Sequence, residues 1–219
     1  MRHRSRFIES NEELNIWPAF TDLMSNTFMI LILFLSLSII NSLMSKAAWE
    51  TKTPTGVPPI LVIEDEGAYR FASGSAEIPP KMDIYIRNKI VAEIERNTKR
   101  YRINVVELIG HTDGQANGNG TSNLDINLEK VANANLPVRN LMAGSNADLG
   151  LMRALAVVRL LRDIQTKNGR LKGLTFRAYS AAQLILPHGD FAPVNRNPDA
   201  TRRRIEIRFT RLGEPIQVK

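Results

Sequence analysis

The sequence of 219 residues contains no cysteine, which excludes disulfide bonds, thiolate metal sites and cysteine nucleophiles. Aromatic residues make up only 6% of the chain. Few of them lie among its basic clusters, so a stacking platform for nucleic-acid bases is poorly supported. Histidine is scarce, and none of His3, His111 and His188 lies in a motif that assembles a hydrolytic site. We therefore predict no enzyme activity, no metal or cofactor and no direct nucleic-acid binding.

What is present is typical of a folded protein with an appendage. The overall composition is ordinary, and the length suffices for one globular domain and an additional segment. The formal net charge is +7 at pH 7. Much of this excess lies in the N-terminal arginines, in residues 96–102 and in residues 202–211.

One long apolar run is the first organising feature. Residues 28–40 carry no charge, and extending the run to 23–44 adds only Ser, Asn and Thr among its polar residues. About 20 helical residues cross a hydrocarbon core of roughly 30 Å. No small-residue cleavage site follows, so we predict a retained signal anchor over residues 16–46. The alternative is a buried helix of a soluble domain.

Charge predicts the orientation of this anchor. Arg2, Arg4 and Arg6 precede it closely, whereas Lys46 and Lys52 follow it with Glu50 between them. The positive-inside rule then places residues 1–15 in the cytoplasm and the rest of the chain outside. In a bacterium, this is a single-pass inner-membrane protein with a periplasmic C-terminal domain. Residues 47–58 are rich in Pro and Thr and indicate a linker.

Asp22 is the one acidic residue of the predicted span. Pro18 suits the first turn of a helix, so Asp22 would lie one turn inside, near the cytosolic boundary of the hydrocarbon. A charge at depth costs about 3 kcal/mol or more, and such residues usually face a partner or a water-filled path. Asp22 is therefore a candidate ion-coupling carboxylate. The alternative is a helix cap at the headgroups.

The remaining chain alternates strand and helix patterns. Apolar periodicity predicts strands over 60–63, 103–109, 174–179 and 203–210, and helices over 79–100 and 147–167. The order β-α-β-α-β-β predicts an α/β sandwich over residues 59–212, with helices on one face of a mixed sheet.

Two resemblances add to this interpretation. The string WPAFTDLMSNTFMILILFLSL resembles the membrane helix of MotB-type stator subunits. The second half resembles the peptidoglycan-binding OmpA C-terminal domain through four motifs in order: FASGSAEIPP, ELIGHTDGQ, NADLGLMRALAVVRLL and NPDATRRRIEIRF. Gly150 and Arg202 depart from the usual serine and asparagine.

The second resemblance implies a site for the diamino acid of peptidoglycan stem peptides, which carries both an ammonium and a carboxylate. It assigns the ammonium to Asp113 and the carboxylate to Arg153, whose planar fork binds bidentately. Asn146 and Leu149 match positions that line the same groove. The alternative is that Asp113 and Arg153 simply pair with each other. Residues 114–145 form a long insertion, which we expect to be a functional loop or partly disordered.

Together the resemblances imply a stator subunit of an ion-driven motor. The chain would form a homodimer inside a ring of a multi-helix MotA/ZorA-like partner, with Asp22 coupling protons or sodium ions. NIWPAFTDLMSN and TRRRIEIRF look closer to ZorB, the MotB-like subunit of the Zorya anti-phage defence system, than to flagellar MotB. Flagellar MotB remains an alternative, as does a passive cell-wall tether without ion transport.

Overall fold

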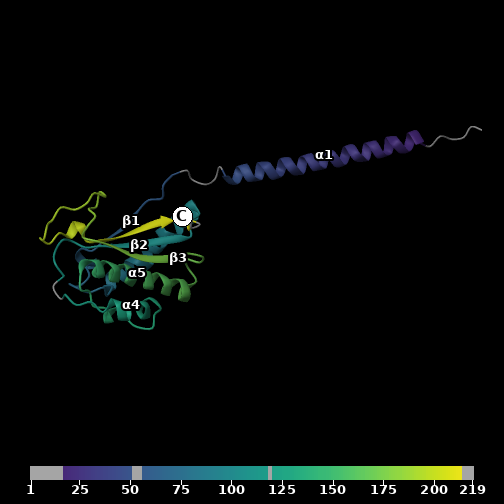
Figure 1. The fold of residues 1–219 in the computed structure, drawn as a ribbon. Helices are drawn as coiled ribbons and strands as arrows, with labels where there is room; N and C mark the ends of the chain where they lie inside the picture. Colours follow the sequence, from purple (N-terminus) through teal and green to yellow (C-terminus); the bar gives the residue numbers. More distant parts are fainter. Residues whose placement is uncertain (1–16, 51–55, 118–119, 214–219) are drawn as a thin grey trace, which may run out of the picture. The chain divides into compact units, whose positions relative to one another are not determined.

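The computed structural model describes residues 17–50, 56–117 and 120–213 (Figure 1). The chain divides into two compact units, residues 1–53 and 54–219. The predicted cytoplasmic segment 1–15 lies outside the described residues, as do residues 51–55 of the predicted linker.

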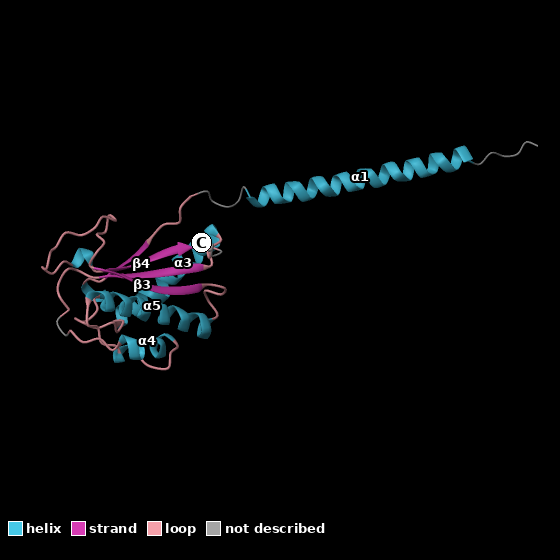
Figure 2. Ribbon diagram, viewed as in Figure 1, coloured by secondary structure: helices cyan, strands magenta, loops and turns pink. Residues whose placement is uncertain are grey.

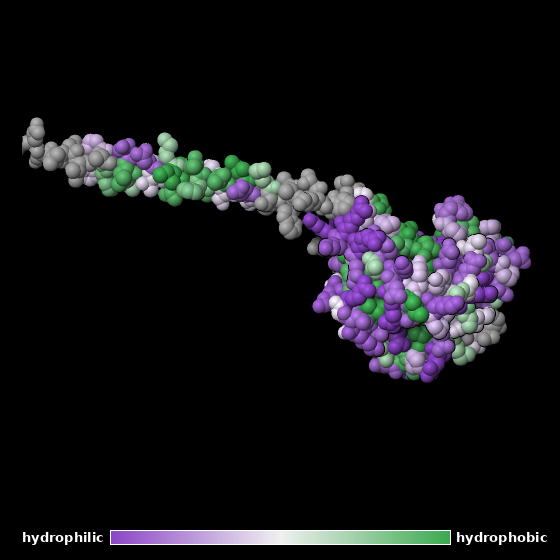
Figure 3. Space-filling view, turned by 180° about the vertical axis from the view of Figure 1, so that it is seen from behind, coloured by the Kyte–Doolittle hydropathy of each residue, from purple (hydrophilic) through white to green (hydrophobic). Residues whose placement is uncertain are grey.

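The described residues of the first unit form one helix, α1, at Trp17–Glu50. Its stretch Phe20–Met44 is long and apolar enough to cross a membrane, and none of it is buried against protein. On the face seen in Figure 3, hydrophobic residues cover most of the middle of this helix. The hydroxyls of Thr21 and Thr27 donate back to helix carbonyls at 2.8 Å, which explains how an apolar helix tolerates them. The helix continues to Glu50, so residues 47–50 of the predicted linker are helical.

The second unit is an α/β domain (Figure 2). Its helices and strands are β1 Leu61–Glu64, α2 Pro80–Tyr85, the π-helix Ile86–Ile90, α3 Val91–Tyr101, β2 Val105–His111, α4 Leu124–Ala132, α5 Asn146–Asn168, β3 Thr175–Ala182 and β4 Arg204–Thr210. Short 3-10 turns lie at Gly67–Tyr69, Val138–Asn140 and Ala200–Arg202. The predicted order β-α-β-α-β-β is confirmed, with α4 added before α5.

The four strands form one mixed sheet in the order β1-β4-β2-β3. β2 and β3 are parallel, whereas β4 is antiparallel to both β1 and β2. α5 connects the parallel pair, as such a pair requires a crossover. One hydrophobic core packs the α2–α3 segment and α5 against one face of the sheet, where Leu108 lies opposite Ile207. The opposite face carries charged residues, including Glu206 opposite Ile109.

The insertion is more ordered than the sequence led us to expect. Residues 124–132 form the helix α4, which packs on α5 through a second apolar cluster that includes Leu124, Val131 and Met152. Arg159 and Arg162 of α5 donate to carbonyls of Leu136 and Ala132, at 2.7 and 3.0 Å. We expected a functional loop or a partly disordered segment over residues 114–145, and within it residues 124–132 are instead an ordered helix.

Candidate functional site

A small pocket lies at the edge where β1 and β2 end and α5 begins. Both strands run antiparallel to β4, so their C-terminal ends meet at the same edge. The pocket measures about 110 Å³. Its lining includes all four predicted ligand residues of the domain, Asp113, Asn146, Leu149 and Arg153, together with Asp65, Arg70, Phe71, Ser73, Gly74, Thr112, Gln115, Ala116, Asn117 and Arg203.

The first turns of α5 present three of these residues. The Ser145 side chain caps the helix by accepting from the Asp148 amide at 3.2 Å. The Asp148 carboxylate accepts from the Gly144 amide at 2.9 Å, which ties down the preceding loop. Residues three, four and seven apart share a helix face, so Asn146, Leu149 and Arg153 all reach the pocket.

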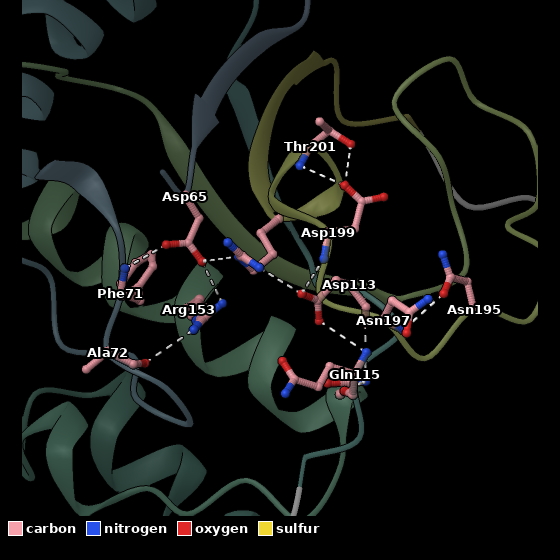
Figure 4. A network of polar contacts seen from close by, with 12 residues as sticks. Asp65, Phe71, Ala72, Asp113, Gln115, Arg153, Asn195, Asn197, Asp199 and Thr201 are labelled. Carbon is pink, nitrogen blue, oxygen red and sulfur yellow. Dashed lines mark hydrogen bonds and ion pairs between the residues drawn. The ribbon is translucent and has the colours of Figure 1, made fainter. Parts of the chain in front are cut away.

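Asp113 lies just after β2, and three groups hold its carboxylate (Figure 4). One carboxylate oxygen accepts from the Gln115 amide at 3.2 Å, and the other accepts from the Asp199 amide at 3.1 Å. The second oxygen also pairs with Arg203 at 2.8 Å. The side-chain amide of Asn146 donates to the backbone carbonyls of Asp113 and Gln115, at 3.4 and 2.9 Å, and so joins α5 to this loop.

Arg153 is fixed just as firmly. It pairs with Asp65 at 2.9 Å, and it donates to the carbonyls of Ser75 and Ala72 at 3.1 and 3.4 Å. Its guanidinium lies over the ring of Phe71, 4.9 Å from the centroid. Burial lowers the pKa of Arg153 from its ordinary value, and the Asp65 carboxylate opposes that shift.

Each of the two predicted ligand residues therefore forms its shortest ion pair with a residue other than its predicted counterpart. In the described part of the chain, no ion pair joins Asp113 to Arg153; Asp113 pairs with Arg203, and Arg153 pairs with Asp65. The alternative that the two predicted ligands neutralise each other does not describe the structure. Asp113 and Arg153 line one pocket with different nearest partners. Arg203 links the two pairs, because its Nε also lies 3.9 Å from the Asp65 carboxylate.

Sequence reasoning missed Asp65 and Arg203. Asp65 stands between Glu64 and Glu66 in an acidic run that is typical of a solvated strand end, yet Asp65 is only 2% exposed. Its carboxylate also accepts from the Phe71 amide at 2.6 Å. The available signal was position: Asp65 directly follows an apolar strand, just as Asp113 follows another.

His111 lies behind the pocket, on the helix-free face of the sheet. It is 2% exposed, and its Nε2 is 3.4 Å from the Glu206 carboxylate. Burial, followed by the charge of Arg204, lowers the pKa of His111 below its ordinary value. Burial raises the pKa of Glu206, but hydrogen bonds from Arg208 and Arg204 outweigh it, so the net shift is downward. This network supports the strand end that carries Asp113.

Asp22 belongs to the other unit. It lies on the exposed surface of α1, where Trp17, Pro18, Thr21 and Ser25 line a shallow hollow with it. Among the described residues, no three side chains that could hold a metal ion cluster together.

No family model matches the chain, and no curated protein matches it. Solved structures do resemble it. The periplasmic domain of Helicobacter pylori MotB is 20% identical, with a TM-score of 0.41, 69% of this chain covered and 75% of that one. A putative MotB-like protein from Desulfovibrio vulgaris is 18% identical, with a TM-score of 0.41 and coverage of 70% and 75%. The type VI secretion cell wall anchor from Pseudomonas aeruginosa is 18% identical, with a TM-score of 0.35 and coverage of 68% and 78%. Because these identities are low, the function has to be argued from the residues of this chain itself.

Proposed function

We propose that this chain is a peptidoglycan-anchored stator subunit of an ion-driven inner-membrane motor. The observation that carries the proposal is the pocket in which Asp113, Asn146, Leu149 and Arg153 converge. Four residues separated by up to 40 positions in sequence meet where the motifs predict a common ligand.

The charges of the pocket suit a zwitterionic ligand with a carboxylate. Asp65 and Asp113 supply two negative charges, and three arginines, at positions 70, 153 and 203, supply three positive ones. The side chain of Arg70 is exposed, so it is accessible to a ligand. A diamino acid would place its ammonium at Asp113 and its carboxylate at Arg153, in competition with the existing partners Arg203 and Asp65.

The motor part of the proposal depends on α1. In this proposal α1 spans the inner membrane with residues 1–15 in the cytoplasm, and the domain lies in the periplasm. Asp22 faces helices of a MotA/ZorA-like partner ring that encloses two copies of this chain, and it binds and releases the transported proton or sodium ion. The length and apolar character of Phe20–Met44 support the span.

Within this class, we infer a role in Zorya anti-phage defence rather than in flagellar motility. The support is the resemblance of NIWPAFTDLMSN and TRRRIEIRF to ZorB. The competing function is a passive wall tether, in which Asp22 carries no ion. The alternative that Asp22 caps the helix is wrong, because α1 already includes Trp17.

Asp22→Asn separates the motor from the tether. We expect the full chain, co-expressed with the motor subunit from its own genome, to lose phage protection while still sedimenting with purified peptidoglycan. The matched control is Thr27→Val, since the Thr27 hydroxyl only bonds its own helix. Full phage protection together with unchanged motility in Asp22→Asn would contradict the motor. Lost motility with unchanged protection would favour a flagellar motor over the defence role.

A further inference from the structure

The end of the domain opposite the pocket is strongly basic. Here α3 and α5 end, β2 and β3 begin, and β4 ends. We call this set of residues the basic end: Arg96, Lys99, Arg100, Arg102, Lys167, Arg170, Lys172 and Arg211, with the acids Glu93, Glu95 and Asp163. Direct contacts join its parts, since Arg170 pairs with Glu95 at 2.5 Å and Arg211 donates to the Tyr101 carbonyl at 2.9 Å.

The acids of the basic end are already occupied. Glu93 pairs with Arg96 at 2.8 Å, and Asp163 pairs with Lys167 at 2.6 Å, in addition to the Glu95 pair. Apart from Arg102, seven basic side chains against three acidic ones leave an excess of four positive charges among the described residues of this end.

The basic end exposes lysines and one leucine on its surface. Lys99 and Lys172 are exposed at the rim of an open hollow of about 480 Å³ between α3 and the α5–β3 turn. Leu212 lies next to Arg211 and is 62% exposed. Basic residues beside an exposed leucine are typical of surfaces that bind anionic membranes.

The chain enters the domain from this same end. β1 is antiparallel to β4 and runs toward the pocket edge, so the N-terminal end of β1 points toward the basic end. A domain anchored to a bilayer by a segment that precedes β1 is therefore tethered through this side. Clusters of Lys and Arg beside a membrane anchor bind anionic lipids.

We propose that the basic end binds the anionic lipid headgroups of the bilayer in which α1 is anchored, and so holds the domain on the membrane with its pocket directed away. This inference rests on the proposed membrane anchor. It gives the subunit a second, electrostatic contact, distinct from the wall site.

The absence of cysteine allows a direct test on the full chain. Asn168→Cys places one fluorophore at the basic end, and Val194→Cys, 91% exposed in the loop between β3 and β4, places one toward the pocket end. Each protein is reconstituted into phosphatidylcholine vesicles with or without phosphatidylglycerol, and headgroup-labelled lipid serves as quencher. We expect phosphatidylglycerol to increase quenching at position 168 about twofold or more at about 0.1 M salt, and about 1 M salt to abolish the increase. Position 194 should show none.

Removal of charge gives the decisive comparison. Lys99→Gln, Arg100→Gln and Lys172→Gln together should weaken association with the anionic surface about a hundredfold, at roughly fivefold per basic residue. The matched control removes three exposed lysines elsewhere, Lys81, Lys89 and Lys130, and should change nothing.

Equal quenching with and without phosphatidylglycerol overturns the proposal. Loss of function in the triple variant without any lipid dependence also overturns it and points to an acidic protein partner instead. Peptidoglycan sedimentation of the same proteins distinguishes the two ideas. Intact sedimentation without lipid dependence refutes the lipid contact alone, whereas lipid dependence without sedimentation refutes the wall anchor alone.

Discussion

Single residues decide how the pocket works, and a substitution of Arg153 tests this most directly. Arg153→Lys keeps the charge but loses the planar fork that reaches Asp65 and two backbone carbonyls. We expect peptidoglycan binding to fall about tenfold or more, measured by sedimentation of the full chain. The free energy of unfolding should also fall, because the buried Asp65 carboxylate would lose part of its ion pairing with residue 153. Arg162→Lys, an exposed arginine of the same helix, is the control. Unchanged binding in Arg153→Lys would contradict the assigned role.

Gly150 explains one departure from the OmpA-like motif. A Cβ at this position would lie 2.4 Å from the Ser180 hydroxyl and 2.8 Å from the Gly110 carbonyl oxygen. Alanine usually favours a helix by about 1 kcal/mol over glycine, but overpacking costs about 1–3 kcal/mol. We expect Gly150→Ala to destabilise the domain, as measured by thermal unfolding. Gly56→Ala, where a Cβ meets nothing, should be neutral. An increase in unfolding temperature for Gly150→Ala would show that α5 packs less closely on the sheet.

His111 predicts a loss of stability in mild acid. Its pKa is lowered in the folded state, so below about pH 6.5 the unfolded chain takes up a proton more readily than the folded one. Stability should therefore fall as the pH drops from about 6.5 toward the lowered folded pKa, by up to about 1.4 kcal/mol per pH unit. Glu206, with its lowered pKa, adds a further loss only in stronger acid. In unfolding experiments from pH 7 to 5, His111→Gln should reduce the dependence of the unfolding free energy on pH. An unchanged dependence would mean that other groups cause it.

At the residue scale, the sequence predicted four pocket residues and missed two. The resemblance of two local motifs to the OmpA C-terminal domain led to Asp113 and Arg153. Their actual charge partners could not be predicted in this way. Asp65 is 88 residues from Arg153, and Arg203 is 90 residues from Asp113. The antiparallel pairing of β4 with both β1 and β2 brings Asp65, Asp113 and Arg203 to the same edge.

Among the elements, α4 was missed because it is short and its stability depends on tertiary contacts. Nine residues cannot maintain a helix alone, so α4 depends on packing against α5. The long helices and the strands were easier to predict because their apolar periodicity extends over many residues. The end of α1 could not be fixed, since residues 47–50 carry no breaker.

The dependence of α4 on packing gives a paired test. Leu124→Ala removes a side chain that is 6% exposed in the second apolar cluster and should cost about 2–5 kcal/mol. Ile126→Ala, on the same helix but 68% exposed, should be within about 0.5 kcal/mol of the parent. Thermal unfolding of both variants measures the difference. Equal effects would mean that α4 does not pack as described.

For the whole molecule, the two units have separate tasks in the proposed mechanism. α1 carries Asp22, and the α/β domain carries the pocket at one end and the basic end at the other. No described side chain belongs to both tasks. Variants in one unit should therefore leave the other unit's function measurable, which is why Asp22→Asn is expected to retain wall binding.

The central claim is that the pocket recognises both charges of a peptidoglycan diamino acid. The most direct measurement is a calorimetric titration of the full chain with a stem peptide ending in that diamino acid. The same peptide with its diamino carboxylate amidated serves as the comparison. We predict binding of the free carboxylate form, and loss of that binding on amidation and in Arg153→Lys. Equal affinity for both peptides would contradict the account, because it would show that the carboxylate assigned to Arg153 contributes nothing to binding.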